Sequence, residues 1–384
     1  MKLLYFHNGS DLYGASRSFL RLNSRLINDD FTVKAVLPKK GPLYNALAEA
    51  GVEVEIMQPF PIIERAAFKR ISGFIKLLFL TPVSVIKICR LIRSFKPDLI
   101  HSNLSVLFTP AIAARLKGVP HIWHIRESYA EFGLFWKVYR SFMLWGCDHV
   151  VAVSTPIAEQ FPQVGDKVVV IHNGFPRGEF EGVTQERIQV FKKKHGLKDE
   201  LLVGLVGRIK YLRKGQEYVV EAAAKLKNQY PQVRYLLIGS PFPGNEDHLE
   251  RLRGLIAETG TESVVIYTGD EDDIKAAYGA LDISVMASGL PEPFGGVVIE
   301  SMAMELPVVG TNIGGTLEQV EDGMTGILIP PRNPEAMADA LSKLLENSDL
   351  RIQMGKAGRT RFEALFEFEP FYSKIKDIYE EVSC

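Results

Sequence analysis

Short apolar, β-branched runs alternate with stretches of helical periodicity along the first half of the chain. The runs expected to form strands are residues 2–6, 32–37, 52–56, 98–102, 121–125, 149–154 and 167–172. Helical patterns such as GASRSFLRLNSRLIN, residues 14–28, lie between them. Strands separated by helices predict βαβ units and a parallel sheet.

A segment rich in Gly and Pro, NGFPRGEFEG at 173–182, interrupts this pattern, which then restarts. The second set of expected strands is 201–207, 234–240, 264–270, 282–288, 306–311 and 326–330. We therefore predict an α/β fold of two Rossmann-like domains whose parallel sheets face a central cleft. A length of 384 residues suits two such domains.

The predicted boundaries are 1–180 for the N-terminal domain and 181–365 for the C-terminal domain. The closing helical segment, 366–384, is expected to cross back to the first domain. Ligand sites in such sheets lie at the carboxyl ends of the strands. The chemistry is therefore expected in the strand-to-helix loops.

Composition and charge narrow the classes of protein. Residues 1–180 carry 22 Lys and Arg against 14 Asp and Glu, whereas the remaining 204 carry 23 against 32. This asymmetry suggests that the first domain meets an anionic partner, although scattered surface charge would give the same count. Cys89, Cys147 and Cys384 are far apart, which argues against disulfides or a zinc site and fits a reducing cytosol.

The chain is not expected to span a membrane or to carry a signal peptide. Its longest uncharged apolar run near the middle, 77–86, has ten residues and includes a proline, and a spanning helix needs about 20. The first residues, MKLLYF, are too short for the apolar region of a signal peptide and are typical of a first strand.

A basic loop, GRIKYLRKG at 207–215, follows the first strand of the second domain. Arg208 directly after the strand and Lys214 at the helix start could both face one bound group. A diphosphate carries about two negative charges, and paired Arg and Lys neutralise it without a metal. The alternative is that these are solvated surface cations.

The stretch EPFGGVVIE, residues 292–300, combines two glycines with two carboxylates. Gly295 and Gly296 are expected at a helix N-terminus, where free amides can bind phosphate. Glu292 and Glu300 would repel phosphate but accept hydrogen bonds from vicinal sugar hydroxyls, one from a hexose and the other from a ribose. Together these groups outline a nucleotide sugar. Alternatively, Glu300 only stabilises the helix dipole and Glu292 is loop surface.

Several other motifs have structural explanations. The loop 11–16 either approaches an anion or is a tight turn with Ser16 as N-cap. His7, His101, His121 and His172 lie in or next to strands and are expected to pack. The acids at 270–273 offer the DxD pattern of a metal site, but at a helix start we expect them to act as caps.

Segment 64–96 has eight Lys or Arg, one acid and many Ile, Leu and Phe. This combination suits an anionic membrane face, with Lys69, Arg70 and Lys76 at the surface, and a lipid-linked acceptor. The alternative is an ordinary crossover helix with a buried apolar side. No nucleic-acid module accompanies the basic residues, so nucleic acid is not an expected partner.

The E-x7-E form of EPFGGVVIE resembles that of retaining glycosyltransferases with the GT-B fold, and the chain is similar to glycosyltransferase family 4 (glycosyl transferases group 1). The resemblance covers nearly the whole chain. Its further motifs are GASRSFL, DLIHSN, WHIRES, VIHNG, GRIKYLRKG, Ser288 and NIGGTLEQVEDGMTGILI.

The resemblance implies roles for particular residues. Arg208 and Lys214 would hold the donor diphosphate, Glu292 the sugar hydroxyls, and Glu300 the ribose. Further donor contacts would come from Gly14, Thr268, Gly269, Pro293, Phe294, Gly295 and Gly296, with the base resting around 268–273. His124 would face the transferred sugar, so the expected catalytic set is His124, Arg208, Lys214 and Glu292.

The sequence departs from the family pattern in two ways. Its first loop reads YGAS where many relatives have a double glycine, which puts the acceptor role of this loop in doubt. No carboxylate of the first domain stands out as a nucleophile. Retention would therefore proceed by front-side attack, as proposed for the family, with the departing phosphate taking the acceptor proton.

We therefore expect a cytoplasmic, metal-independent, retaining hexosyltransferase that needs no cofactor. Its donor would be a nucleotide diphosphate sugar, with UDP favoured as the commoner nucleotide. Its acceptor would be a lipid-linked cell-envelope glycan such as lipopolysaccharide, reached by peripheral contact with the inner membrane face. The alternatives are a nucleotide-sugar epimerase of similar shape and a non-catalytic, two-lobed sugar-binding protein.

Overall fold

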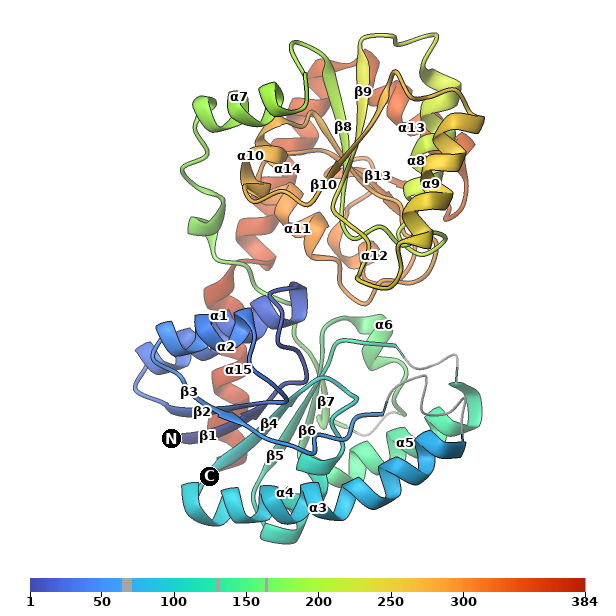
Figure 1. The fold of residues 1–384 in the computed structure, drawn as a ribbon. Coiled ribbons are helices and arrows are strands. Elements are labelled where there is room, and N and C mark those ends of the chain that lie inside the picture. Colours follow the sequence, from blue (N-terminus) through green and yellow to red (C-terminus); the bar gives the residue numbers. More distant parts are fainter. Residues whose placement is uncertain (64–70, 129–131, 163–164, 384) are drawn as a thin grey trace. The chain divides into compact units, whose positions relative to one another are not determined.

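The chain folds into two compact units in the computed structural model (Figure 1). The structure describes residues 1–63, 71–128, 132–162 and 165–383. Unit 1 comprises Met1–Gly174 and Glu369–Cys384, and unit 2 comprises Phe175–Phe368. The chain passes from unit 1 to unit 2 after Gly174 and returns after Phe368.

Unit 1 contains a seven-stranded parallel sheet. In sheet order its strands are β3 (Glu53–Ile56), β2 (Thr32–Leu37), β1 (Lys2–Phe6), β4 (Leu99–Asn103), β5 (His121–Ile125), β6 (His149–Ala152) and β7 (Val168–Val170). β4 and β5 are buried along their whole length although they include histidine, serine and asparagine, because parallel strands of this kind are covered on both faces.

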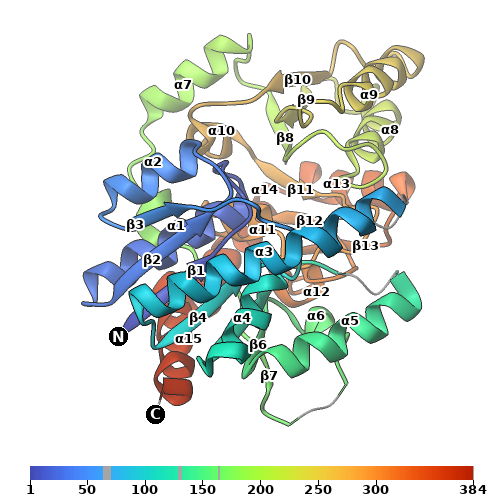
Figure 2. The ribbon, with the colours of Figure 1, turned by 60° about the horizontal axis from the view of Figure 1, so that its bottom comes forward.

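Helices cover both faces of this sheet (Figures 1 and 2). They are α1 (Gly14–Asn28), α2 (Pro42–Glu49), α3 (Ile71–Phe95), α4 (Thr109–Lys117), α5 (Gly133–Gly146), α6 (Thr155–Ala158) and α15 (Phe368–Ser383). Phe19 of α1 packs on Tyr5 with ring centroids 4.6 Å apart, while Tyr139 of α5 meets the edge of Trp123 on the opposite face.

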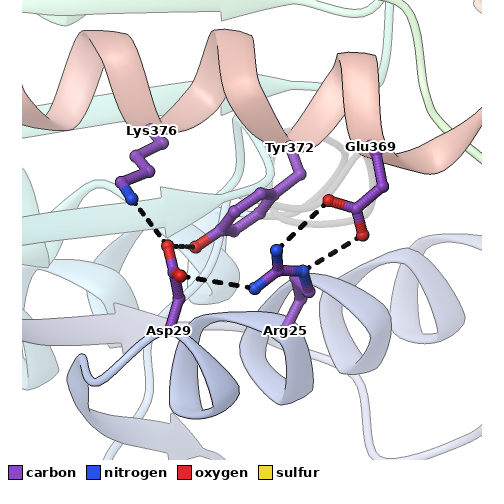
Figure 3. A network of polar contacts seen from close by, with 5 residues as sticks. All are labelled: Arg25, Asp29, Glu369, Tyr372 and Lys376. Carbon is purple, nitrogen blue, oxygen red and sulfur yellow. Dashed lines mark hydrogen bonds and ion pairs between the residues drawn. The ribbon is translucent and has the colours of Figure 1, made fainter.

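Helix α15 joins unit 1 although almost 200 residues of unit 2 separate it from β7 along the sequence. Figure 3 shows its polar contacts with α1: Glu369 accepts from Arg25 at 3.1 and 3.3 Å, and Tyr372 and Lys376 both donate to Asp29, at 2.8 and 2.7 Å. The closing helix thus belongs to unit 1, which is the arrangement expected from the sequence.

Unit 2 contains a six-stranded parallel sheet. Its strands, in sheet order, are β10 (Val265–Gly269), β9 (Val233–Ile238), β8 (Leu201–Val206), β11 (Ile283–Met286), β12 (Val308–Thr311) and β13 (Gly326–Ile329). Its helices are α7 (Gln185–Lys194), α8 (Gln216–Leu226), α9 (Asp247–Glu258), α10 (Ile274–Ala280), α11 (Gly296–Ala303), α12 (Thr316–Gln319), α13 (Pro334–Glu346) and α14 (Ser348–Leu365), with a short 3₁₀ helix, η3 (Arg177–Phe180).

Each face of the unit 2 sheet has its own apolar core. Leu237 and Tyr235 of β9 pack with α8, α9 and α13 on one face. Leu236 and Ile238, the alternate residues of the same strand, pack with α7 and α10 on the other. The predicted α/β fold with two parallel sheets is therefore confirmed, and each predicted strand is present within a few residues of its expected bounds.

Candidate donor site

The order of strands reverses between β8 and β11 in unit 2, because β8 leads outward to β9 while β11 leads outward to β12. In open α/β sheets, ligands bind outside the carboxyl ends of strands at such a reversal. The two loops that start there are the basic loop after β8 and the segment after β11 that holds Glu292 and the two glycines. The topology thus brings both predicted motifs to one edge of one sheet.

Lys214 and Glu292 form an ion pair across these two loops. The Lys214 Nζ lies 2.9 Å from the Glu292 Oε1, and their side chains are 25% and 19% exposed. Burial alone would raise the pKa of the Glu292 carboxyl, but Lys214, together with Arg213, outweighs burial and lowers it. Glu292 is therefore ionised at neutral pH. The sequence placed both residues in the site but did not predict their contact.

Glycines allow these loops to pack backbone against backbone. Gly215 has φ +77°, and a Cβ there would lie 1.9 Å from the carbonyl oxygen of Ala287. Gly314, in the β12–α12 loop, likewise lies against the backbone of Glu292, and the Gly315 amide donates to the Glu292 carbonyl at 2.8 Å. The β12–α12 loop thus holds the backbone of Glu292, and the basic loop packs against the start of the same segment at Ala287.

Arg208 is placed by the first residue of α8. Gln216, 1% exposed, donates from Nε2 to the Arg208 carbonyl at 2.9 Å. The Arg208 guanidinium lies over the Phe242 ring, 5.2 Å from its centroid. Gln216 was not predicted from the sequence, since a glutamine at the start of a helix forms no recognisable motif.

Helix α11 begins at Gly296 with Gly295 as its N-cap, as expected. The first amides of a helix have no partner within it and favour an anion. Gln319, fully buried at the end of α12, donates to the Gly295 carbonyl at 2.9 Å. Phe294 is 8% exposed. Pro293 has no amide hydrogen, so Pro293 can shape the loop but cannot donate a hydrogen bond to a phosphate.

Glu300 lies one turn into α11 and accepts a hydrogen bond from the Tyr278 hydroxyl at 2.7 Å. The residues expected near the base, Thr268 and Gly269, are the last two of β10. Thr268 donates to the carbonyl of Gly269, which has φ +74°. The predicted donor residues of unit 2 therefore lie at the carboxyl edge of one sheet, at a strand end, in loops or in the first turns of a helix.

Three of the four acids at 270–273 bind protein groups. Asp273 is the N-cap of α10 and accepts from the Ala276 amide at 3.1 Å, as predicted. Asp270 accepts from the Ser240 amide, and Glu271 pairs with Lys194 and His195. Over the described ranges, no group of three or more His, Cys, Asp or Glu side chains is arranged to hold a metal ion.

Unit 1 has its own reversal of strand order, between β1 and β4. A continuous chain of hydrogen bonds lies there: Arg126 donates to Asn103 (2.7 Å), Asn103 contacts His7 (3.0 Å), His7 contacts Ser16 (3.0 Å), and Ser16 donates to Asp11 (3.1 Å). Burial lowers the pKa of His7 to about 4, so its ring is neutral. No sequence pattern predicted that residues from three separate segments would form this chain.

The interpretation of Ser16 as an N-cap was wrong. Helix α1 begins at Gly14 with Tyr13 as N-cap, and Ser16 lies inside the first turn, where its hydroxyl bonds to Asp11. Gly14 has no heavy atom within 4 Å of where a Cβ would stand, so the space beside it is open. Its predicted contact with the donor stays a prediction.

His124 lies in the core of unit 1 rather than at a loop. It is 0% exposed, neither ring nitrogen has a hydrogen-bond partner among the described residues, and its ring lies 6.5 Å from that of Phe371 on α15. Burial, with Arg126 and His101 nearby, holds its pKa well below the usual value. Its predicted contact with the transferred sugar stays untested, and this burial weighs against it.

The predicted membrane surface falls only partly within the described chain. Lys69 and Arg70 lie outside the described residues, as does the side chain of Lys76. Helix α3 exposes an apolar stripe, made of Ile75, Leu78, Phe79, Val83 and Ile86. No helix in the described part of the chain is both long and apolar enough to cross a membrane.

Two family models match the chain. The model of glycosyltransferase family 4 matches residues 14–177, and that of glycosyl transferases group 1 matches residues 187–361. Together they cover most of both units, in the order that the sequence motifs indicate. The chain belongs to this family of glycosyltransferases.

Curated relatives agree with this assignment, and a solved structure shares the fold. The chain is 27% identical to the lipopolysaccharide core biosynthesis glycosyltransferase LpsE of Rhizobium meliloti over 96% of both chains. It is 32% identical to the D-inositol 3-phosphate glycosyltransferase of Corynebacterium urealyticum over 47% of its own length, and it spans only 43% of that relative. The crystal structure of Anabaena HepE in complex with UDP superposes with a TM-score of 0.85 at 23% identity, covering 99% of this chain and 100% of HepE. The fold is thus the predicted GT-B fold.

Proposed function

We propose that the protein transfers a hexosyl group from a nucleotide diphosphate sugar to a hydroxyl of a growing cell-envelope glycan, with retention of anomeric configuration and without a metal ion. The observation that carries this proposal is the meeting of Lys214 and Glu292 at the strand reversal of unit 2, beside the α11 start at Gly296. The Lys214 cation and the amides at the α11 start suit the diphosphate, and the Glu292 carboxylate beside them suits the hydroxyls of an attached sugar.

Each group has a distinct part in the proposed reaction. Lys214 and Arg208 neutralise the diphosphate as negative charge grows on the leaving oxygen, and the amides at the α11 start stabilise the same charge. Glu292, held ionised by its partner lysine, accepts hydrogen bonds from sugar hydroxyls. The acceptor hydroxyl attacks from the side of the leaving phosphate, which takes its proton.

The choice of a nucleotide sugar has support from structural relatives. HepE was crystallised with UDP and with UDP-glucose. The melting temperature of the purified protein should rise with one of UDP, GDP and TDP. It should also rise with a nucleotide sugar that carries the same nucleoside diphosphate. The active pair should transfer the sugar in the presence of EDTA, and NMR of the product should show the anomeric configuration of the donor.

Two rival activities are separated by leaving out the acceptor. An epimerase would interconvert its nucleotide sugar with no acceptor present, whereas a transferase would at most hydrolyse it slowly. A non-catalytic sugar-binding protein would bind free sugar and leave the nucleotide sugar intact. Interconversion of the donor without acceptor would refute the proposed transfer.

The proposed acceptor is lipid-linked, with the protein in peripheral contact with an anionic membrane. The stripe on α3 supports this: Leu78 and Phe79 are 64% and 71% exposed, and the exposed Lys87 and Arg90 follow them on the same helix. An apolar face with basic residues beside it suits the surface of anionic lipids.

Co-sedimentation with vesicles of phosphatidylglycerol and phosphatidylcholine tests this contact. Replacing Leu78 and Phe79 with Ser should reduce pelleting, while Ile352→Ser, which removes a comparably exposed apolar residue from unit 2, should leave it unchanged. Equal pelleting of all three proteins would reject the membrane surface and leave the proposed transfer intact.

A further inference from the structure

A buried tyrosine in unit 2 holds one of the two predicted carboxylates. Tyr278 is 1% exposed, and its ring lies in the apolar core formed by α7, α10 and neighbouring strands. Its hydroxyl reaches out of this core and lies 2.7 Å from the Glu300 Oε2. A buried tyrosine hydroxyl needs a polar partner, and here that partner belongs to the candidate site.

The helix that carries Tyr278 is fixed at both ends. At its start, Asp273 caps α10 and also receives two hydrogen bonds from Arg187 of α7, at 2.7 and 2.6 Å. Near its end, Gly279 allows close packing, because a Cβ there would lie 3.1 Å from Ile188 of α7. The Tyr278 hydroxyl is therefore presented to Glu300 from a rigid support.

This contact sets the direction of the Glu300 carboxylate. An ionised carboxylate only accepts hydrogen bonds, so the Tyr278 hydroxyl must be the donor, and it occupies one of about four lone-pair sites. The other oxygen, Oε1, lies beside the start of α11, 3.8 Å from where a Cβ on Gly296 would stand. The lone pairs that stay available thus lie next to the amides proposed to bind phosphate.

We propose that Tyr278 is a positioning residue that aims Glu300 at the vicinal hydroxyls of the ribose and so makes the site select ribonucleotides over 2′-deoxyribonucleotides. This inference rests on the proposed function, in which Glu300 binds the donor ribose. A carboxylate held in place cannot turn to other partners when the 2′-hydroxyl is missing. Sites built to bind a hydroxyl discriminate strongly against ligands that lack it.

The test compares the binding of a nucleoside diphosphate and its 2′-deoxy analogue by isothermal titration calorimetry. The base is the one that gives the largest thermal shift with the wild-type protein. The variants are Tyr278→Phe and Glu300→Gln, and the matched control is Tyr235→Phe. Tyr235 is also fully buried in unit 2, and its hydroxyl has no hydrogen-bond partner within the described residues.

We expect Tyr278→Phe to raise the Kd of the ribonucleotide by about 5-fold. This is less than the more than about 10-fold that a whole hydrogen bond to a charged group would give, because the lost bond orients Glu300 and does not itself touch the ligand. The Kd of the 2′-deoxy analogue should change by less than about 2-fold, so the preference for ribose falls. Glu300→Gln should reduce the preference further, and Tyr235→Phe should keep the wild-type ratio.

The outcomes separate this inference from the function on which it rests. If the wild-type protein binds none of the diphosphates, the proposed function fails and the inference fails with it. If the wild-type protein binds but shows no preference for ribose, or if Tyr278→Phe keeps the wild-type ratio, only the inference is overturned. Equal weakening of both ligands by Tyr278→Phe would indicate a general structural role and would also overturn it.

Discussion

Acid should destabilise unit 1 through His121, which is buried and neutral. Its Nε2 lies 2.9 Å from the Ser102 hydroxyl and its Nδ1 lies 2.8 Å from the Gly146 carbonyl. One ring nitrogen therefore donates to the carbonyl and the other accepts from the hydroxyl, as in a neutral imidazole. Burial lowers the pKa to about 4, with Asp148 raising and Arg115 lowering it by smaller amounts.

The size of the effect follows from this pKa. In the unfolded chain a histidine titrates near 6.5, so between pH 6.5 and 4 the unfolded state binds a proton that the folded state does not. The free energy of unfolding therefore falls as the pH falls through this window. Between pH 7.5 and 5.0 the contribution of His121 amounts to about 2 kcal/mol.

Urea unfolding followed by tryptophan fluorescence measures this loss in unit 1 alone. The three tryptophans, Trp123, Trp136 and Trp145, all belong to unit 1, and the Trp123 ring lies 5.3 Å from that of His121. At pH 7.5, the free energy of unfolding of His121→Gln should be about 1–3 kcal/mol lower than that of the wild type, because the buried Ser102 hydroxyl and Gly146 carbonyl lose the imidazole as hydrogen-bond partner. At pH 5.0 this gap should narrow by about 2 kcal/mol.

A stability gap that stays constant between the two pH values would refute the reasoning. It would mean that His121 already carries a proton in the folded state, or that the fold takes up the proton without cost. The control is His248→Gln in unit 2, whose unfolding the tryptophans do not report. Its fluorescence transition should follow that of the wild type at both pH values.

Three further predictions concern substitution or labelling of single residues at four positions. Gly215→Ala should lower the free energy of unfolding by at least about 2 kcal/mol, because the residue has positive φ and a Cβ would overlap a backbone carbonyl, and a thermal melt checks this. Lys214→Ala should weaken nucleotide affinity and turnover together, whereas Glu292→Ala should reduce turnover far more than affinity; an unchanged turnover of Glu292→Ala would show that it does not bind the sugar. Burial raises the pKa of the Cys147 thiol to about 12, so mass spectrometry should find it unmodified by iodoacetamide until the protein unfolds.

The sequence predicted the fold well because buried parallel strands leave a strong pattern. Strands such as β5 and β8 are apolar over most of their length and end at loops rich in glycine or charge. Helix starts were also predictable where a short polar residue caps them, as Asp273 does for α10. These signals depend only on neighbouring residues, so a single sequence is enough to detect them.

Contacts between distant loops could not be predicted in the same way. The motifs that contain Lys214 and Glu292 place both residues in one site, but their ion pair joins residues 78 positions apart and depends on how two loops pack. The position of Tyr278 was missed for a similar reason, since a tyrosine in an apolar helix is usually core. His124 was assigned to the transferred sugar from its motif alone, and the sequence did not show that α15 packs beside it.

The return of α15 to unit 1 has a consequence for biosynthesis. On the ribosome, the strands of unit 1 emerge first, yet the helix that covers His101 and His124 follows only after all of unit 2. Unit 1 therefore waits, with the part of its sheet around His101 and His124 uncovered by α15, until after all of unit 2 has been made. The half of the protein that is made first is thus finished last, and it is the half most in need of a chaperone.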